Sequence, residues 1–149
     1  MTPLCTPAFY FDQDIFLSEQ EKIFRGQWQL IGFKMEVRDH NNFLCRKVGG
    51  KSVIIHNFRG QLKAFHNVCS HRSSRIHSQE IGSGPLQCPY HGWTYDCEGI
   101  PKGIPYVSEF DQLNDETRKE LRLNSWLIDS CGQFIFVKEK KDNISLKSF

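Results

Sequence analysis

The 149-residue chain has no apolar run near the roughly 18 residues that a membrane-spanning helix needs. Its opening residues, Met1 to Pro7, also lack the basic region and the apolar stretch of a signal peptide. Hydrophobic residues make up 39% and charged residues 24% of the chain, the ordinary balance for a water-soluble domain. We therefore expect a cytoplasmic protein that makes no membrane contact and folds as a single domain over residues 1–149.

A stretch dominated by charge of one sign is also missing. Nineteen lysines and arginines are scattered among seventeen aspartates and glutamates, which gives a formal net charge of +2. A protein that follows a phosphate backbone needs a basic stripe on its surface. The charge pattern therefore predicts no nucleic-acid partner.

Six cysteines are present, but the secreted, cysteine-dense context in which disulfide frameworks occur is absent. Two of the six, Cys69 and Cys88, are better explained as metal ligands. We expect the remaining four to be ordinary free thiols: Cys5, Cys45, Cys97 and Cys131.

Regular structure is predicted mainly as short strands. Residues 18–21 have the form of a capping box, which predicts a short helix beginning there, and Ile23, Phe24 and Trp28 give that helix an apolar side to close one end of a β core. Asn114 is the expected cap of a second brief helix. Turn signals between the strand-like runs favour antiparallel hairpins in an all-β fold. These runs cover residues 28–37, 43–48, 52–58, 62–66, 121–128 and 134–137.

Residues 67–105 are rich in glycine, serine and proline, and we expect mostly loop there. A segment so poor in regular structure needs a cross-link to hold its shape, and a bound metal cluster can act as one. This segment is the predicted cluster-binding subdomain. The charged and polar residues 138–149 are predicted to form a tail or linker.

Within this segment lie two short pairings of a thiol with an imidazole. One residue separates Cys69 from His71, and two residues separate Cys88 from His91. A Rieske 2Fe-2S cluster has two thiolates on one iron and two imidazoles on the other. Its potential is higher than that of an all-cysteine cluster because neutral imidazoles leave it less negatively charged. Zinc accepts the same four ligands in tetrahedral geometry, and spacing alone does not exclude it.

The residues around these pairings resemble the Rieske domain of ring-hydroxylating, non-heme iron oxygenase large subunits, and the resemblance covers nearly the whole chain. It implies a Rieske-type antiparallel β-sandwich with a small cluster-binding subdomain. One departure is Ser73-Ser74, which stands where the family commonly has Gly-Ala. The matching motifs are Cys69-Ser70-His71-Arg72 and Cys88-Pro89-Tyr90-His91-Gly92-Trp93-Thr94-Tyr95-Asp96.

The resemblance also implies roles for individual residues. Cys69 and Cys88 would hold the inner iron, while His71 and His91 would hold the outer iron near the surface. The resemblance also implies that four further side chains surround these ligands: Arg72, Tyr90, Trp93 and Tyr95.

Three of these surrounding residues bear on the reduction potential of the cluster. Tyr95 resembles a hydroxyl donor to a ligand thiolate. Tyr90 and Trp93 stand where high-potential respiratory Rieske proteins carry a disulfide cysteine and a serine. Both replacements predict a lower potential. Residues 103–105 resemble a third loop that shields the cluster.

The function implied is one-electron transfer by the N-terminal domain of an aromatic-ring-hydroxylating oxygenase large subunit. A ferredoxin or flavin reductase would be the electron donor, an oxygenase catalytic domain or subunit would be the acceptor, and the family's usual assembly implies a homotrimer. No histidine follows His91, so we expect no mononuclear iron in this chain. The alternative is a free-standing Rieske-type ferredoxin that carries electrons between a reductase and an oxygenase.

Overall fold

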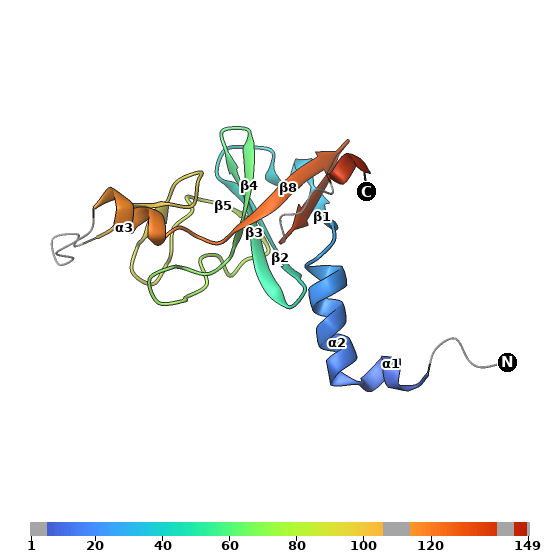
Figure 1. The fold of residues 1–149 in the computed structure, drawn as a ribbon. Coiled ribbons are helices and arrows are strands. Elements are labelled where there is room, and N and C mark those ends of the chain that lie inside the picture. Colours follow the sequence, from blue (N-terminus) through green and yellow to red (C-terminus); the bar gives the residue numbers. More distant parts are fainter. Residues whose placement is uncertain (1–5, 106–113, 140–144, 149) are drawn as a thin grey trace.

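The computed structural model describes residues 6–105, 114–139 and 145–148. Its main sheet has seven antiparallel strands in the order β1-β9-β8-β4-β3-β2-β5, and β6 pairs with β7 in a second, two-stranded ladder (Figure 1). The all-β, antiparallel prediction is thereby confirmed. The strands are β1 Gln29–Phe33, β2 Asn42–Val48, β3 Lys51–Phe58, β4 Gln61–His66, β5 Ile81–Ser83, β6 Thr94–Tyr95, β7 Pro101–Gly103, β8 Ser125–Cys131 and β9 Phe134–Lys138.

The main sheet curls, and side chains on both of its faces are buried. β1 lies close to β2, although the two are far apart in the strand order, and a side chain at Gly32 would clash with Leu44. Along β3, Val53 and Ile55 enter one core while Ile54 enters the other, because successive side chains of a strand point to opposite faces. The second core joins the sheet to the loops and contains Phe43, Ile54, Phe65, Cys69, Ile76, Leu86, Cys88, Trp93, Tyr95, Ile104 and Leu123.

The N-terminal helix begins earlier than the capping-box pattern predicts. Asp12 is the true cap, because its Oδ1 accepts the N–H of Asp14 at 2.9 Å and of Ile15 at 3.1 Å. Ser18 therefore lies inside a helix, and the prediction of a helix start at residues 18–21 is wrong. The helical segments here are α1 Ala8–Phe11, α2 Gln13–Glu19 and the π-helical turn η1 Gln20–Phe24.

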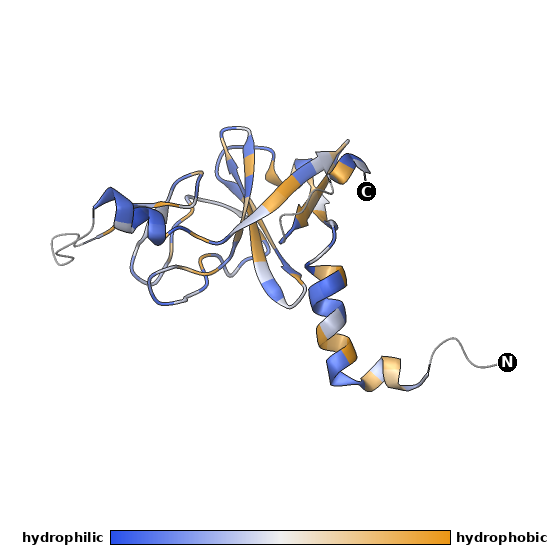
Figure 2. Cartoon of the chain, viewed as in Figure 1, coloured by the Kyte–Doolittle hydropathy of each residue, from blue (hydrophilic) through white to orange (hydrophobic). Residues whose placement is uncertain are grey.

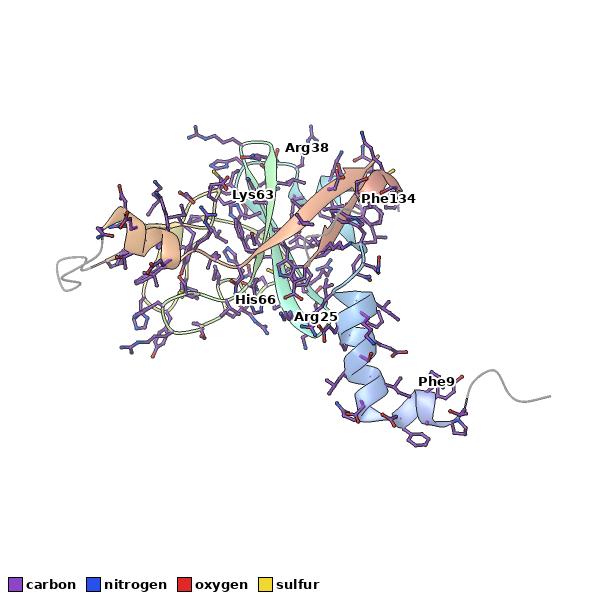
Figure 3. All side chains as sticks on the ribbon, in the orientation of Figure 1. Phe9, Arg25, Arg38, Lys63, His66 and Phe134 are labelled. Carbon is purple, nitrogen blue, oxygen red and sulfur yellow. The ribbon has the colours of Figure 1, made fainter. Side chains whose placement is uncertain are left out.

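Of the three apolar residues predicted to close one end of the core, only Trp28 does so. Trp28 is buried, but Ile23 and Phe24 are 49% and 41% exposed. Helices α1 and α2 project away from the sheet, and orange apolar patches mark both (Figures 1 and 2). Arg25 attaches their base to the sheet through a 3.7 Å ion pair with Glu139, whose N–H also donates to the Arg25 carbonyl (Figure 3). None of the helices in the described ranges has both the length and the apolar character that crossing a bilayer demands.

Most predicted strands match the structure to within one residue, but two do not. β1 ends at Phe33 rather than at residue 37, because the Glu36 carboxylate accepts the Phe33 N–H at 2.6 Å and Lys34–Val37 turns into a 3-10 helix, η2. β8 begins at Ser125 rather than at residue 121, since the chain first forms a helix.

That helix, α3 (Asp115–Glu120), is capped by Asn114 as predicted, because the Asn114 side chain accepts the Thr117 N–H at 2.9 Å. The predicted tail starts too early, because Lys138 is the last residue of β9 and is fully buried. A 3-10 turn, η4 (Leu146–Ser148), lies within the rest of that range. As expected, Cys45, Cys97 and Cys131 are free thiols, while Cys5 lies outside the described residues.

Two loops between the strands share one backbone arrangement. In the first, the N–H of Cys69 donates to the Ser74 carbonyl at 2.8 Å, and the N–H of Ser73 donates back to the Cys69 carbonyl at 3.0 Å. In the second, the N–H of Cys88 donates to the Trp93 carbonyl at 2.8 Å, and the N–H of Gly92 donates back to the Cys88 carbonyl at 3.0 Å. The residues are spaced along the chain as in the first loop. The loops therefore present a cysteine from equivalent positions.

The fifth residue of each turn has a left-handed backbone, with φ of 55° at Ser73 and 70° at Gly92. Glycine adopts this conformation without strain, whereas a residue with a Cβ does not. The glycine that the resemblance implies at this position would therefore adopt this backbone more easily than Ser73 does.

His56 on β3 is the most deeply buried imidazole of the described chain. Its Nε2–H donates to the Gly84 carbonyl at 3.0 Å, and nothing among the described residues hydrogen-bonds to Nδ1. Burial lowers the pKa of His56 to about 4, although the bond to Gly84 opposes this shift. The side chain is therefore neutral in the native fold at neutral pH.

We predict that Ser73→Gly stabilises the folded protein by about 0.5–1 kcal/mol. The substitution removes the Cβ that strains the left-handed backbone, and this gain exceeds the cost of a more flexible unfolded chain. Urea unfolding measures the change. Ser74→Gly is the control, since the backbone there needs no left-handed residue and the substitution should destabilise. Equal destabilisation by both substitutions would contradict the strain argument.

The buried His56 predicts a loss of stability in acid. The native state binds fewer protons than the unfolded state, so its contribution of about 3 kcal/mol is complete above pH 6.5 and is lost as the pH falls through about 4. His56→Gln keeps a donor for Gly84 but does not titrate. Denaturant unfolding from pH 7 to pH 4 should show a shallower loss of stability in this variant than in the wild type; identical pH profiles for the two proteins would refute the assignment.

Candidate metal centre

The structure brings the four predicted donors together from two loops. Cys69 and His71 lie on the loop that follows β4, and Cys88 and His91 lie on the loop that precedes β6. The ring centroids of His71 and His91 are 4.6 Å apart at 65°, and the thiols of Cys69 and Cys88 are close enough to interact. The site therefore has a sulfur end and an imidazole end.

The sulfur end is sheltered. Cys69 is 2% and Cys88 1% exposed, and both belong to the core that joins the sheet to the loops. The hydroxyl of Tyr95 lies 3.0 Å from the Cys69 sulfur and accepts the N–H of Ser70 at 3.2 Å. Because Ser70 supplies a donor to the Tyr95 oxygen, the Tyr95 proton is available to a Cys69 thiolate.

The acidity of the Cys69 thiol reflects opposing influences. Burial raises the pKa of Cys69, the hydrogen bond from Tyr95 lowers it, and the neighbouring Cys88 thiol raises it again. Burial also raises the pKa of Tyr95, so the hydroxyl keeps its proton. Tyr95 can therefore donate a hydrogen bond to a sulfur anion without itself becoming charged.

The imidazole end is half-buried and is flanked by two aromatic rings. The Trp93 ring stacks on His71 at 4.8 Å and 4°, and the Tyr90 ring lies 4.0 Å from His91. Trp93 is buried, whereas Tyr90 is 65% exposed. Arg72 is also exposed beside this end. Partial burial, the neighbouring His91 and the Arg72 charge all lower the pKa of His71, which favours the neutral imidazole that binds metals.

A third loop, residues 103–105, packs against the second. A side chain at Gly92 would come within 3.1 Å of the Pro105 ring, and the hydroxyl of Thr94 accepts the Gly103 N–H at 3.0 Å. Helix α3 supports this loop, because Arg118 donates to the carbonyls of residues 101 and 102 at 3.1 and 3.2 Å. The sequence contains no local signal for the contribution of Arg118, which lies far along the chain.

The donor set fits a 2Fe-2S cluster with mixed ligation. Such a cluster needs two thiolates on one iron and two neutral imidazoles on the other. Here the two thiols are buried together, and the two imidazoles lie side by side and are only half-buried. Cys69 and Cys88 would hold the inner iron, and His71 and His91 the outer iron.

Sequence reasoning missed two polar side chains that shape the loops. Gln87 Nε2 donates to the Gly92 carbonyl at 3.2 Å and braces the second loop. Asn67 is completely buried at the start of the first loop. A polar residue directly after a strand was the only available signal for Asn67, and Gln87 offered none.

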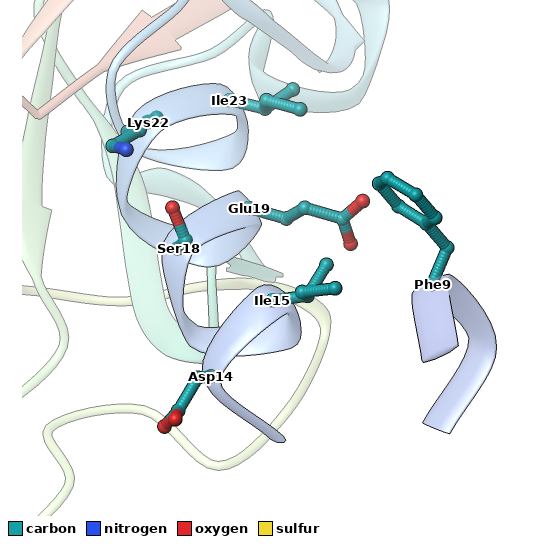
Figure 4. A pocket seen from close by; sticks show the side chains of 7 residues that line it. All are labelled: Phe9, Asp14, Ile15, Ser18, Glu19, Lys22 and Ile23. Atoms are coloured by element: carbon teal, nitrogen blue, oxygen red, sulfur yellow. The ribbon is translucent and has the colours of Figure 1, made fainter. Parts of the chain in front are cut away.

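A hollow between α1 and α2 does not compete as a metal site. Its volume is about 380 Å³, and Phe9 on α1 faces Ile15 and Glu19 on α2 across it (Figure 4). The residues around it supply neither a thiol nor an imidazole. They are Phe9, Asp14, Ile15, Ser18, Glu19, Lys22 and Ile23.

Known proteins resemble this chain in both sequence and fold. The oxygenase subunit of glycine betaine monooxygenase from Pseudomonas aeruginosa is 34% identical over 145 residues, which are 95% of this chain and 32% of that protein. Benzene 1,2-dioxygenase subunit alpha from Pseudomonas putida is 27% identical over 146 residues, 96% of this chain and 32% of that protein. The crystal structure of naphthalene 1,2-dioxygenase from Rhodococcus sp. bound to indole matches with a TM-score of 0.82 at 25% identity, covering 94% of this chain and 32% of that one.

The chain thus spans about a third of the length of these relatives. The family of the Rieske [2Fe-2S] domain matches residues 27–125, a range that includes both loops and the sheet between β1 and the start of β8. This match decides between the two metals that spacing alone left open, in favour of one 2Fe-2S cluster over zinc. On this sequence match, and with a fold and donor set that agree with it, the chain belongs to the Rieske [2Fe-2S] domain family.

Proposed function

We propose that this chain is the electron-transfer domain of a Rieske oxygenase large subunit, with Cys69 and Cys88 on the sheltered iron and His71 and His91 on the exposed iron. The observation that carries the proposal is that the two ends of the site differ: one end has buried thiols and the other has less buried imidazoles. Its thiols are 2% and 1% exposed, while its imidazoles are only half-buried and lie between Trp93 and the exposed Tyr90.

The bound cluster supplies one-electron redox chemistry. The protein sets the conditions for it. Tyr95 donates a hydrogen bond toward the Cys69 sulfur and so favours the more negative, reduced state. Trp93 covers one face of His71 and keeps water from it. His91 meets the surface beside Tyr90, so the imidazole end is the place where an electron enters or leaves.

The proposed partners follow from this geometry and from the relatives. A ferredoxin or flavin reductase would deliver electrons to the imidazole end. The acceptor would be a mononuclear iron in an oxygenase catalytic domain, either in the same subunit or in a neighbouring subunit of a homotrimer. That iron would belong to the part of the relatives that this chain does not span. That this chain itself holds no mononuclear iron stays a prediction.

The identities favour one class of oxygenase over another. The glycine betaine monooxygenase subunit is 34% identical, whereas the benzene dioxygenase subunit is 27% identical over a similar length. We therefore propose that the associated catalytic domain acts on a quaternary ammonium compound rather than on the aromatic ring expected from the motifs. The pocket that selects the substrate would lie in that domain.

Anaerobic redox titration tests the electron-transfer role. The purified protein should take up one electron per 2Fe-2S cluster and return it to ferricyanide, and Cys88→Ala should abolish this exchange. With a reductase and glycine betaine, the chain alone should consume no oxygen. Oxygen consumption coupled to substrate oxidation would refute the proposed division of labour, and full activity as a soluble carrier for a separate oxygenase would favour the ferredoxin alternative.

Tyr95→Phe is predicted to lower the reduction potential by roughly 30–60 mV, which corresponds to about 0.7–1.4 kcal/mol for one electron. The substitution removes the hydrogen bond to the Cys69 sulfur and keeps the buried ring. Tyr90→Phe, which removes an exposed hydroxyl beside His91, is the matched control and should leave the potential nearly unchanged. Equal shifts in both variants, measured by voltammetry, would argue against the role of Tyr95.

A further inference from the structure

Asn67 occupies the junction between β4 and the first cluster loop. It follows His66, the last residue of β4, and comes two positions before Cys69. Its side chain is completely buried, although carboxamides are mostly exposed in proteins. A buried amide needs partners for its donor and its acceptor groups, and the structure supplies them.

The main partner of Asn67 is the backbone of His77. The Asn67 Oδ1 accepts the His77 N–H at 3.0 Å, and the Asn67 Nδ2 donates to the His77 carbonyl at 2.7 Å. A carboxamide carries both a donor and an acceptor, so one side chain satisfies both backbone groups of one residue, as a neighbouring strand would. A carboxylate or a hydroxyl cannot do this in the same geometry.

Asn67 is also tied to the sheet. Its Nδ2 lies 3.2 Å from the Ser52 hydroxyl and 3.5 Å from the Cys45 sulfur, and its own N–H donates to the Ser52 carbonyl at 2.9 Å. Ser52 lies on β3 and Cys45 on β2. The junction of strand and loop is therefore fixed to β2 and to the start of β3.

The far end of the loop is fixed as well. The His77 ring stacks on Phe43 of β2 at 3.8 Å and 9°, and Ile76 is 2% exposed. The pairing of Asn67 with His77 closes residues 67–77 into a loop, and both ends of this loop are anchored in the core. Cys69 and His71 lie on that loop.

We propose that Asn67 is a positioning residue of the metal centre. By joining the two ends of the 67–77 loop, its amide sets where Cys69 and His71 stand relative to Cys88 and His91 on the other loop. This inference rests on the proposed assignment of the four ligands. Loss of the amide would leave the His77 N–H without its side-chain partner and the His77 carbonyl with only the weak 3.9 Å contact from the Cys45 thiol, and it would free the two ends of the loop to separate.

Asn57 provides a matched control on the same sheet. It is 3% exposed, its Nδ2 donates to the carbonyls of Val37 and Arg38 at 2.7 and 3.1 Å, and its Oδ1 accepts the Gly60 N–H at 2.6 Å. It thus closes the β3–β4 turn as Asn67 closes the loop, with the same kinds of bond. Its partners include no residue of either cluster loop.

The test compares Asn67→Ala with Asn57→Ala in the protein carrying its cluster. Both substitutions should lower the unfolding temperature. Only Asn67→Ala should speed the release of iron to a chelator, by roughly 10- to 100-fold, and change the g values of the dithionite-reduced protein. Ser52→Ala removes one contact of Asn67 but keeps its pairing with His77, and it should speed iron release by a smaller factor.

Each outcome decides the inference. If Asn67→Ala shows the same iron-release rate and the same spectrum as Asn57→Ala, the inference is overturned and the proposed function stays intact. Wild-type protein that binds no cluster would overturn the proposed function first. If Asn67→Ala does not fold, Ser52→Ala decides, and a release rate equal to wild type in that variant would count against the role of Asn67.

Discussion

The burial of two cysteine side chains in the same core as the sheet is the interaction on which the rest of this structure depends. Cys69 and Cys88 pack with Phe43, Ile54 and Phe65, so loops with little regular structure of their own are held against β2, β3 and β4. Burial raises the pKa of the Cys69 thiol, and a bound metal would stabilise the anionic form of that sulfur. Sulfur inside and imidazole outside is a consequence of this packing.

The two cluster loops obtain the same backbone turn from different sequences. In each, the cysteine N–H and carbonyl are bonded within the loop and the fifth residue is left-handed, yet that residue is Ser73 in one loop and Gly92 in the other. The histidine follows its cysteine by two positions in the first loop and by three in the second. This offset lets two similar turns direct both imidazoles to one side, where Trp93 and Tyr90 flank them.

Much of the fold could be predicted from the sequence, as could the four residues that meet at the candidate site, because the information is local. Strand runs such as residues 43–48 and the Asn114 cap depend on neighbouring residues, and both were confirmed. The predicted cap at residues 18–21 was wrong because Asp12, earlier in the chain, already satisfies the helix start. A local pattern cannot reveal which of two competing caps is used.

The supports of the site could not be predicted, because they join distant segments. Asn67 closes its loop on His77, and Arg118 reaches the third loop from helix α3. Neither side chain belongs to a motif, and each acts through backbone groups whose identity the sequence does not record. The sequence motif therefore indicates which residues are the donors, while contacts in the tertiary structure set the distances between them.

Pulsed electron paramagnetic resonance on the reduced protein, grown with ¹⁵N-labelled histidine, tests the central claim most directly. The account predicts a 2Fe-2S signal with strong couplings to nitrogens of two histidines, one of which is lost in His71→Cys. A reduced cluster without histidine coupling, or a protein that contains zinc and no paramagnetic signal, would contradict the assignment of a nitrogen-bound iron at the exposed end.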